Sequence, residues 1–146
     1  MNSSEQAKIG VSHVAIVVPN LDAAAARFAT LFGVFAGAPA ENPVQGVRLR
    51  RIAFGSFHIE LLEPTRPDGP LAGFLRRNPG GGLHHLALKT RDLDATLTNV
   101  ADAGVDVIGN PGVNVDGNRM AFLKPATVLG VLVELEEAKE PINTRD

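Results

Sequence analysis

The sequence contains no cysteine among its 146 residues. This absence excludes disulfide bonds, catalysis by a thiolate and metal sites that use cysteine ligands. A metal ion can still be bound by neutral imidazole and by carboxylate groups, both of which suit divalent first-row metals. Any metal site in this chain must therefore be built from histidine, aspartate and glutamate.

A strong excess of one charge is also absent. The chain has 14 lysines and arginines against 16 aspartates and glutamates, which gives a formal net charge of -2. Such a balance creates no large field of one sign that would attract nucleic acid or an anionic membrane. We therefore expect neither nucleic acid nor a membrane as a partner.

Long hydrophobic runs are missing as well. Apolar runs such as "VAIVVP" and "VLGVLVEL" are far shorter than the roughly 20 apolar residues that a membrane-spanning helix needs. The first ten residues, "MNSSEQAKIG", contain no apolar core of the length found in signal peptides. These features predict a soluble protein of the cytoplasm.

An internal repeat is the main feature that the sequence does contain. The segment "HVAIVVPNLDAAAARFATLFGV", which starts at His13, aligns with "HLALKTRDLDATLTNVADAGV", which starts at His85. Further along, "FHIELLEP" aligns with "VLVELEEA" and places Glu60 opposite Glu134. The offset is 72 residues at the histidines and 74 at the glutamates, a drift that one loop can absorb. The two halves are therefore expected to share one fold.

Both halves begin with a short run, rich in β-branched residues in the first half, which is too short for a helix and predicts a strand. Both then continue into a helical pattern. Asn20 and Asp92 stand at the starts of the two helices, where a short side-chain oxygen can accept from free backbone amides. Gly33 and Gly104 follow the helices as expected stops, because glycine most easily adopts the left-handed conformation. Strand-like segments then complete each half.

The resulting order of elements is β-α-β-β-β, twice. We expect an α+β fold in which one domain, residues 9–137, consists of two tandem βαβββ modules at about 9–64 and 82–137. A Pro- and Gly-rich junction joins them, and "PLAGFLRRN" within it favours a short helix beginning at Pro70. The modules are expected to form a curved sheet around a metal-binding cleft.

The repeat separates the two neighbouring histidines of "GLHHLAL". His85 occupies the position of His13, whereas His84 points to the opposite face because side chains alternate along a strand. Glu60 and Glu134 form the corresponding pair on the last strand of each half. Two histidines and two glutamates related by one internal symmetry predict a site for a divalent metal, with coordination positions left for water or substrate.

Other readings remain open around these residues. His58 or Glu63 could supply the functional group in place of Glu60, and a lone histidine or glutamate on a strand usually faces solvent. The segment "GVNVDGNRMAFL" has glycines spaced loosely as in a phosphate-binding loop, but no strand precedes them closely and no "GKS" follows. A hairpin loop is the favoured interpretation of that segment.

This set of residues resembles the vicinal oxygen chelate (glyoxalase/bleomycin resistance/dioxygenase) superfamily and, within it, the methylmalonyl-CoA epimerases. The matching segments span about residues 10–137 and are "HVAIVVPNLDAA", "ENPVQGV", "IELLEP", "GLHHLAL", "DGNRMAFLKP" and "GVLVELEE". The resemblance implies metal ligands at His13, His85 and Glu134, with Glu60 as a fourth. It implies a divalent ion, cobalt, zinc, manganese or nickel, and no further cofactor.

The resemblance further implies an isomerase that epimerises (2R)/(2S)-methylmalonyl-CoA, or a closely related acyl-CoA, through a metal-stabilised enolate. Glu134 and Glu60 are the expected catalytic bases, and the expected assembly is a homodimer. Two departures leave the second base and the binding of CoA open. Leu49 stands where a relative has a proposed glutamate base, and "FLKPA" replaces the usual "FLHPK".

Two alternatives of different kinds accompany this interpretation. A lactoylglutathione lyase of the glyoxalase I type resembles the chain in fold and in all four ligand positions, but acts on a glutathione hemithioacetal. A non-catalytic protein of the same superfamily that sequesters small molecules would need no metal. Metal analysis of the purified protein distinguishes the binding protein, which needs no metal, from the two metal-dependent enzymes. Deuterium uptake at C2 of methylmalonyl-CoA distinguishes the epimerase from the lactoylglutathione lyase.

Overall fold

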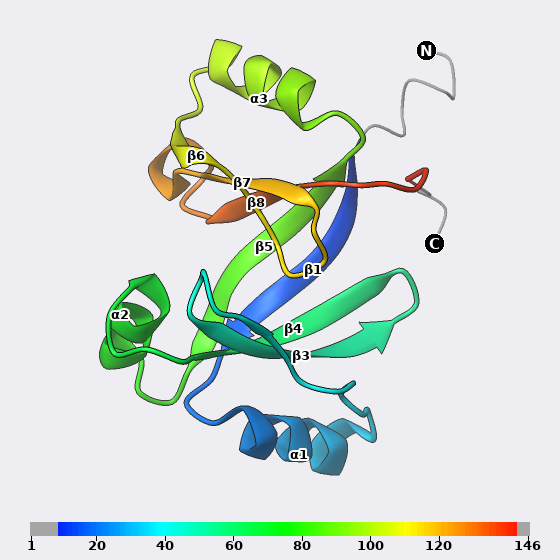
Figure 1. Ribbon diagram of the computed structural model, residues 1–146, viewed down its shortest axis with the longest axis vertical. Helices are drawn as coiled ribbons and strands as arrows, with labels where there is room; N and C mark the ends of the chain where they lie inside the picture. Colours follow the sequence, from blue (N-terminus) through cyan, green and yellow to red (C-terminus); the bar gives the residue numbers. More distant parts are fainter. Residues whose placement is uncertain (1–8, 143–146) are drawn as a thin grey trace. The chain divides into compact units, whose positions relative to one another are not determined.

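The computed structural model describes residues 9–142, so most of the N-terminal segment that bears on a signal peptide lies outside the described part. The elements, in chain order, are β1 (Ile9–Val17), α1 (Leu21–Phe32), β2 (Ala40–Asn42), β3 (Val47–Phe54), β4 (Phe57–Pro64), α2 (Pro70–Arg77), β5 (Gly82–Thr90), α3 (Leu93–Asp102), β6 (Val107–Val113), β7 (Arg119–Leu123), a 3-10 turn (Pro125–Thr127) and β8 (Val133–Glu137). The predicted order β-α-β-β-β therefore occurs twice, with α2 between the copies (Figure 1).

The chain divides into two compact units. Within the described residues, the first unit contains 9–13 and 85–142, and the second contains 14–84. Strands β1 and β5 therefore each contribute residues to both units. Among the helices of the described part, none is both long and apolar enough to cross a membrane.

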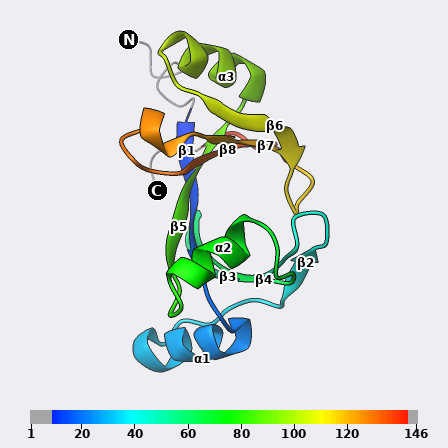
Figure 2. The ribbon, with the colours of Figure 1, turned by 90° about the vertical axis from the view of Figure 1, so that its left-hand side faces the viewer.

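The first unit is built on β5, β8, β7 and β6. Strand β8 pairs in parallel with β5 and antiparallel with β7, which pairs antiparallel with β6. Helix α3 lies over β6, β7 and β8, an arrangement that both views show (Figures 1 and 2). Leu93 of α3 packs there with Leu123, Val133 and Leu135, all buried, and each fully buried leucine contributes roughly 2 kcal/mol to folding.

The second unit repeats this plan. Strands β2, β3 and β4 form an antiparallel sheet, and α1 packs on it through Leu21 and Ala25 against Ile52 and Leu61. The sequence pattern did not identify β2, because its three residues are too few to show an alternation of polar and apolar side chains. The predicted short helix at Pro70 is confirmed as α2.

Both long helices begin as the sequence predicts. The side chain of Asn20 accepts a hydrogen bond from the backbone N–H of Ala23 at 2.9 Å, and Asp92 accepts from Ala95 at 3.0 Å. Each cap satisfies one of the amides that the first helical turn leaves without a partner. The two caps occupy equivalent positions of the repeat, so the internal symmetry extends to the hydrogen bonds.

A carboxylate from a strand also supports each of these helix starts. Glu63 of β4 accepts from the backbone N–H of Leu21, and Glu137 of β8 accepts from that of Leu93 at 2.9 Å. Negative charge at a helix N-terminus is stabilised by the partial positive charge of the unpaired amides. Glu63, considered above as an alternative to Glu60, therefore anchors α1 to the sheet.

Replacing Asp92 with alanine is expected to lower the free energy of unfolding by about 1 kcal/mol, the usual cost of a lost N-cap. Urea denaturation followed by circular dichroism measures the change. Asn99→Ala, at an exposed position inside α3, is the matched control and should not destabilise the protein, because alanine is the better helix former. Equal unfolding midpoints for Asp92→Ala and the natural protein would contradict the expectation.

The segment read as a hairpin loop is confirmed as one. Residues 114–118 connect the antiparallel strands β6 and β7. The side-chain oxygen of Asn114 accepts from the backbone N–H groups of Asp116 and Asn118, both at 3.0 Å. This side chain closes the turn on itself, in the manner typical of asparagine in loops.

Candidate metal centre

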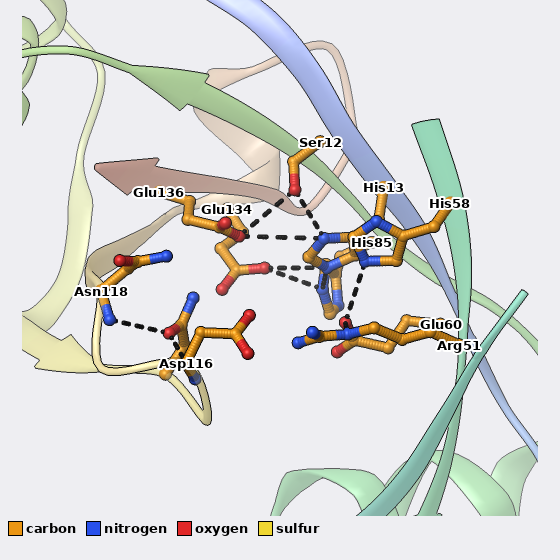
Figure 3. A network of polar contacts seen from close by, with 11 residues as sticks. Ser12, His13, Arg51, His58, Glu60, His85, Asp116, Asn118, Glu134 and Glu136 are labelled. Atoms are coloured by element: carbon orange, nitrogen blue, oxygen red, sulfur yellow. Dashed lines mark hydrogen bonds and ion pairs between the residues drawn. The ribbon is translucent and has the colours of Figure 1, made fainter. Parts of the chain in front are cut away.

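Three of the predicted ligands meet in the first unit. The Nε2 atoms of His13 and His85 lie 3.3 Å apart, and Oε2 of Glu134 lies 3.2 Å from the first and 3.1 Å from the second. The three side chains come from β1, β5 and β8, and Figure 3 shows them pointing toward one another. One donor atom from each residue thus reaches a single small volume.

The pairing of strands explains how these residues meet. Glu134 lies beside Ala87 in the parallel pair of β5 and β8, and His85 precedes Ala87 by two residues, on the same face of β5. On the other side of β8, Phe122 pairs with Glu134. The ring of Phe122 meets the ring of His85 edge-on, with centroids 5.4 Å apart, and gives the cluster an apolar wall.

The cluster is buried and polar. The side chain of His13 is 4% exposed, and those of His85 and Glu134 are each 6% exposed. Burial alone would raise the pKa of Glu134, but hydrogen bonds and charge interactions with His13 and His85 outweigh it and lower the pKa to about 2. Glu134 is therefore a carboxylate at neutral pH, the form that binds metals.

These donors fit a divalent first-row metal. Two imidazole nitrogens and one carboxylate oxygen, each from a different strand, form a donor set of the kind found in catalytic metal sites, in which three protein ligands leave positions open. The other ring nitrogen of His13, Nδ1, lies 3.0 Å from the hydroxyl oxygen of Ser12. Nε2 is consequently the nitrogen that His13 turns toward His85 and Glu134.

Glu60 belongs to the second unit, where it has close partners of its own. Its Oε2 atom accepts from Nε of Arg51 at 3.2 Å and lies 3.3 Å from Nε2 of His58. Arg51 stands opposite Glu60 in the pairing of β3 and β4. The participation of Glu60 in the metal centre stays a prediction, and its contact with Arg51 emerges only from the strand register.

His84 packs against helix α2. Its ring meets the ring of Phe74 in α2 edge-on, with centroids 5.3 Å apart. At the position of the proposed base in a relative, Leu49 is buried between Ala40 of β2 and Leu62 of β4. An apolar side chain thus fills that position of the core, and it carries no group able to transfer a proton.

The sequence argument missed two polar residues beside His13. Ser12 and Glu136 both approach its Nδ1 atom, at 3.0 and 3.8 Å. A signal for Glu136 exists in "VELEE", because a residue two positions after Glu134 points to the same face of the strand. Ser12 gave no comparable signal, since its role depends on the position of Glu136.

Comparisons with known proteins show which family the chain belongs to. Residues 12–122 match the family described as the Glyoxalase/Bleomycin resistance protein/Dioxygenase superfamily. The chain is 40% identical over 129 residues to the ethylmalonyl-CoA/methylmalonyl-CoA epimerase of Cereibacter sphaeroides, in an alignment that covers 87% of this chain and 96% of that protein. It is 33% identical over 129 residues to the mitochondrial methylmalonyl-CoA epimerase of Bos taurus, covering 88% and 74%.

Solved structures give the same result. The chain matches a methylmalonyl-CoA epimerase from Mycobacterium tuberculosis with a TM-score of 0.81 and 29% identity, over 90% of this chain and 89% of that one. It also matches a methylmalonyl-CoA epimerase in complex with methylmalonyl-CoA and NH4+, with a TM-score of 0.84 and 31% identity, over 93% and 99%. The expected α+β fold class and the resemblance to this superfamily are both confirmed.

Proposed function

Since the chain belongs to the Glyoxalase/Bleomycin resistance protein/Dioxygenase superfamily, we propose that it is a metal-dependent isomerase that epimerises methylmalonyl-CoA or a closely related acyl-CoA. The observation that carries this proposal is the buried group formed by His13, His85 and Glu134, whose donor atoms lie within 3.3 Å of one another. The relatives named above support the substrate class, because their names specify ethylmalonyl-CoA and methylmalonyl-CoA.

The chemistry of the substrate explains why such a site is useful. The hydrogen at C2 of methylmalonyl-CoA lies between a thioester and a carboxylate, and its removal as a proton places negative charge on the thioester oxygen. A divalent metal bound by His13, His85 and Glu134 would supply Lewis acidity to the substrate oxygens. We propose cobalt, zinc, manganese or nickel as the ion, since imidazole and carboxylate ligands suit all four.

The protein residues have distinct parts in this proposal. His13 and His85 bind as neutral imidazoles, and the ionised Glu134 adds one negative charge. The surroundings of the three side chains are nearly free of solvent, which strengthens each electrostatic interaction. Inversion at C2 requires that one group removes the proton from one face and a second group returns a proton to the other.

Glu134 and Glu60 are the proposed proton-transferring groups. The pKa of Glu134, about 2, suits a metal ligand better than a general base, because a base works best with a pKa near the working pH. Glu60 is its counterpart in the repeat, and Leu49 offers no ionisable alternative. We therefore propose Glu60 as the second proton-transferring group.

Deuterium exchange tests the proposal most directly. The purified protein, loaded with cobalt, is incubated in deuterium oxide with (2S)-methylmalonyl-CoA, and mass spectrometry and proton NMR follow C2. The expected result is incorporation of deuterium at C2 together with formation of the 2R epimer. No exchange, combined with turnover of methylglyoxal and glutathione, would replace the proposal with a lactoylglutathione lyase.

Replacing Glu60 with glutamine is expected to slow epimerisation by about 10²-fold or more, the usual contribution of a general acid or base. Glu63→Gln is the matched control on the same strand; it weakens the support of α1 and should lower stability while the rate of epimerisation stays the same. Both rates are measured with saturating methylmalonyl-CoA. Unchanged epimerisation and exchange in Glu60→Gln would exclude the catalytic role.

A further inference from the structure

Nδ1 is the ring nitrogen of His13 that points away from His85 and Glu134, and it belongs to a short series of hydrogen-bonded polar atoms. The hydroxyl oxygen of Ser12 lies 3.0 Å from Nδ1 of His13 and 3.3 Å from Oε2 of Glu136 (Figure 3). The same oxygen of Glu136 lies 3.8 Å from Nδ1. Ser12 thus stands between an imidazole that the proposed metal site uses and a carboxylate that the site does not include.

Counting protons assigns the direction of these hydrogen bonds. A carboxylate only accepts, so the single hydroxyl proton of Ser12 is donated to Glu136. Ser12 must then accept the hydrogen bond from His13, which requires a proton on Nδ1. A metal ion bound at Nε2 would take the place of the proton that this nitrogen otherwise donates to Glu134, so that a neutral His13 would keep its proton on Nδ1.

The side chains that form these hydrogen bonds are largely buried. Ser12 is 5% exposed and the side chain of Glu136 is 14% exposed. Solvent has little access to these side chains, and hydrogen bonds are stronger in a medium of low dielectric constant. Glu136 is also on the same face of β8 as Glu134, two residues away. Strand β8 therefore carries one proposed ligand, Glu134, and also the carboxylate that lies near a second proposed ligand, His13.

The internal repeat does not duplicate this arrangement. The positions equivalent to Ser12 and Glu136 are His84 and Leu62. The ring of His84 packs on Phe74, and Leu62 has no polar side-chain atom. The pair of residues therefore supports one of the two related histidines, and it cannot be a general consequence of the repeated fold.

We propose that Ser12 and Glu136 are positioning residues that hold His13 in the Nδ1-protonated tautomer and make its Nε2 a stronger metal ligand. This inference rests on the metal site of the proposed function. A carboxylate that bears on the outer nitrogen of a ligating histidine fixes the orientation of the ring and raises its basicity, and loss of such a partner weakens metal affinity by about 10- to 100-fold.

Titration of the metal-free protein with Co²⁺, followed by visible absorption, tests the effect on affinity. Ser12→Ala and Glu136→Gln are each expected to bind Co²⁺ about tenfold more weakly. Because both act through the same nitrogen, the double variant should lose less than the sum of the two effects. Ser12→Thr keeps the hydroxyl and should bind as the natural protein does.

Glu137→Gln is the matched control. It makes the same chemical change at the adjacent position of β8, where the carboxylate caps α3 at Leu93. We expect it to lower the free energy of unfolding while its affinity for Co²⁺ stays unchanged. A merely structural role of Glu136 would instead make the two glutamate variants alike.

Proton–nitrogen NMR of the Zn²⁺-loaded protein observes the Nδ1 proton of His13 directly. This proton should exchange slowly with solvent, and Ser12→Ala should make it exchange faster. Natural metal affinity together with an unchanged exchange rate of this proton in Ser12→Ala and Glu136→Gln would overturn the inference. If the exchange rate and the affinity respond to these variants but the protein has no epimerase activity, the proposed function is refuted and the inference stands.

Discussion

Replacement of His85 with alanine is expected to abolish metal binding and epimerase activity together. The change removes one of the three donor atoms that meet within 3.3 Å and leaves two ligands. Loss of the Lewis acid forfeits several kcal/mol of stabilisation of developing charge, which corresponds to at least about 10³-fold in rate. Metal content after dialysis and the rate of epimerisation of methylmalonyl-CoA measure the two losses.

The adjacent histidine provides the control. His84→Ala removes the edge-on contact with Phe74, which is worth about 1 kcal/mol of stability. We expect His84→Ala to retain both its metal and its activity while its unfolding midpoint falls. The opposite pattern, with metal lost from His84→Ala and retained in His85→Ala, would refute the assignment of the ligands.

The second large effect is expected for Glu134→Gln. Glutamine has almost the same shape but no charge, so it removes the negative ligand while the residue keeps its place opposite Phe122 in the strand pair. We expect metal affinity to fall and the rate of epimerisation to decrease by at least about 10³-fold, because charge stabilisation by the metal is lost. Co²⁺ titration and the rate with saturating methylmalonyl-CoA test both expectations.

Glu134→Asp separates the two proposed duties of this residue. Aspartate keeps the charge but shortens the side chain by one methylene, which displaces the carboxylate by more than 1 Å from its natural position. If Glu134 is chiefly a ligand, the affinity for Co²⁺ and the rate should fall in proportion. A rate that falls far more than metal occupancy would show that Glu134 also transfers the proton.

The local features of this protein could be read from its sequence. The spacing of the repeat predicted the order of strands and helices, the caps at Asn20 and Asp92, and the choice of His85 over His84 as the partner of His13. The elements and caps follow from periodicity and short-range hydrogen bonding, which depend on residues close together in the chain. The choice of His85 follows from the internal repeat, which aligns positions 72 residues apart. The patterns did not locate the three-residue strand β2 or the 3-10 turn at Pro125–Thr127, because each is too short to carry a pattern.

Tertiary structure decided what depends on contacts between distant segments. The parallel pairing of β5 with β8 determines that Glu134 lies beside the strand of His85, and no periodicity specifies which strands pair. The same holds for Glu63, which reaches Leu21 from 42 residues away, and for Ser12, which meets Glu136 across 124 residues. Residue identity and spacing determined the candidate ligands, whereas the partners that orient them were decided by strand pairing, since hydrogen bonds require atoms to approach within about 3 Å.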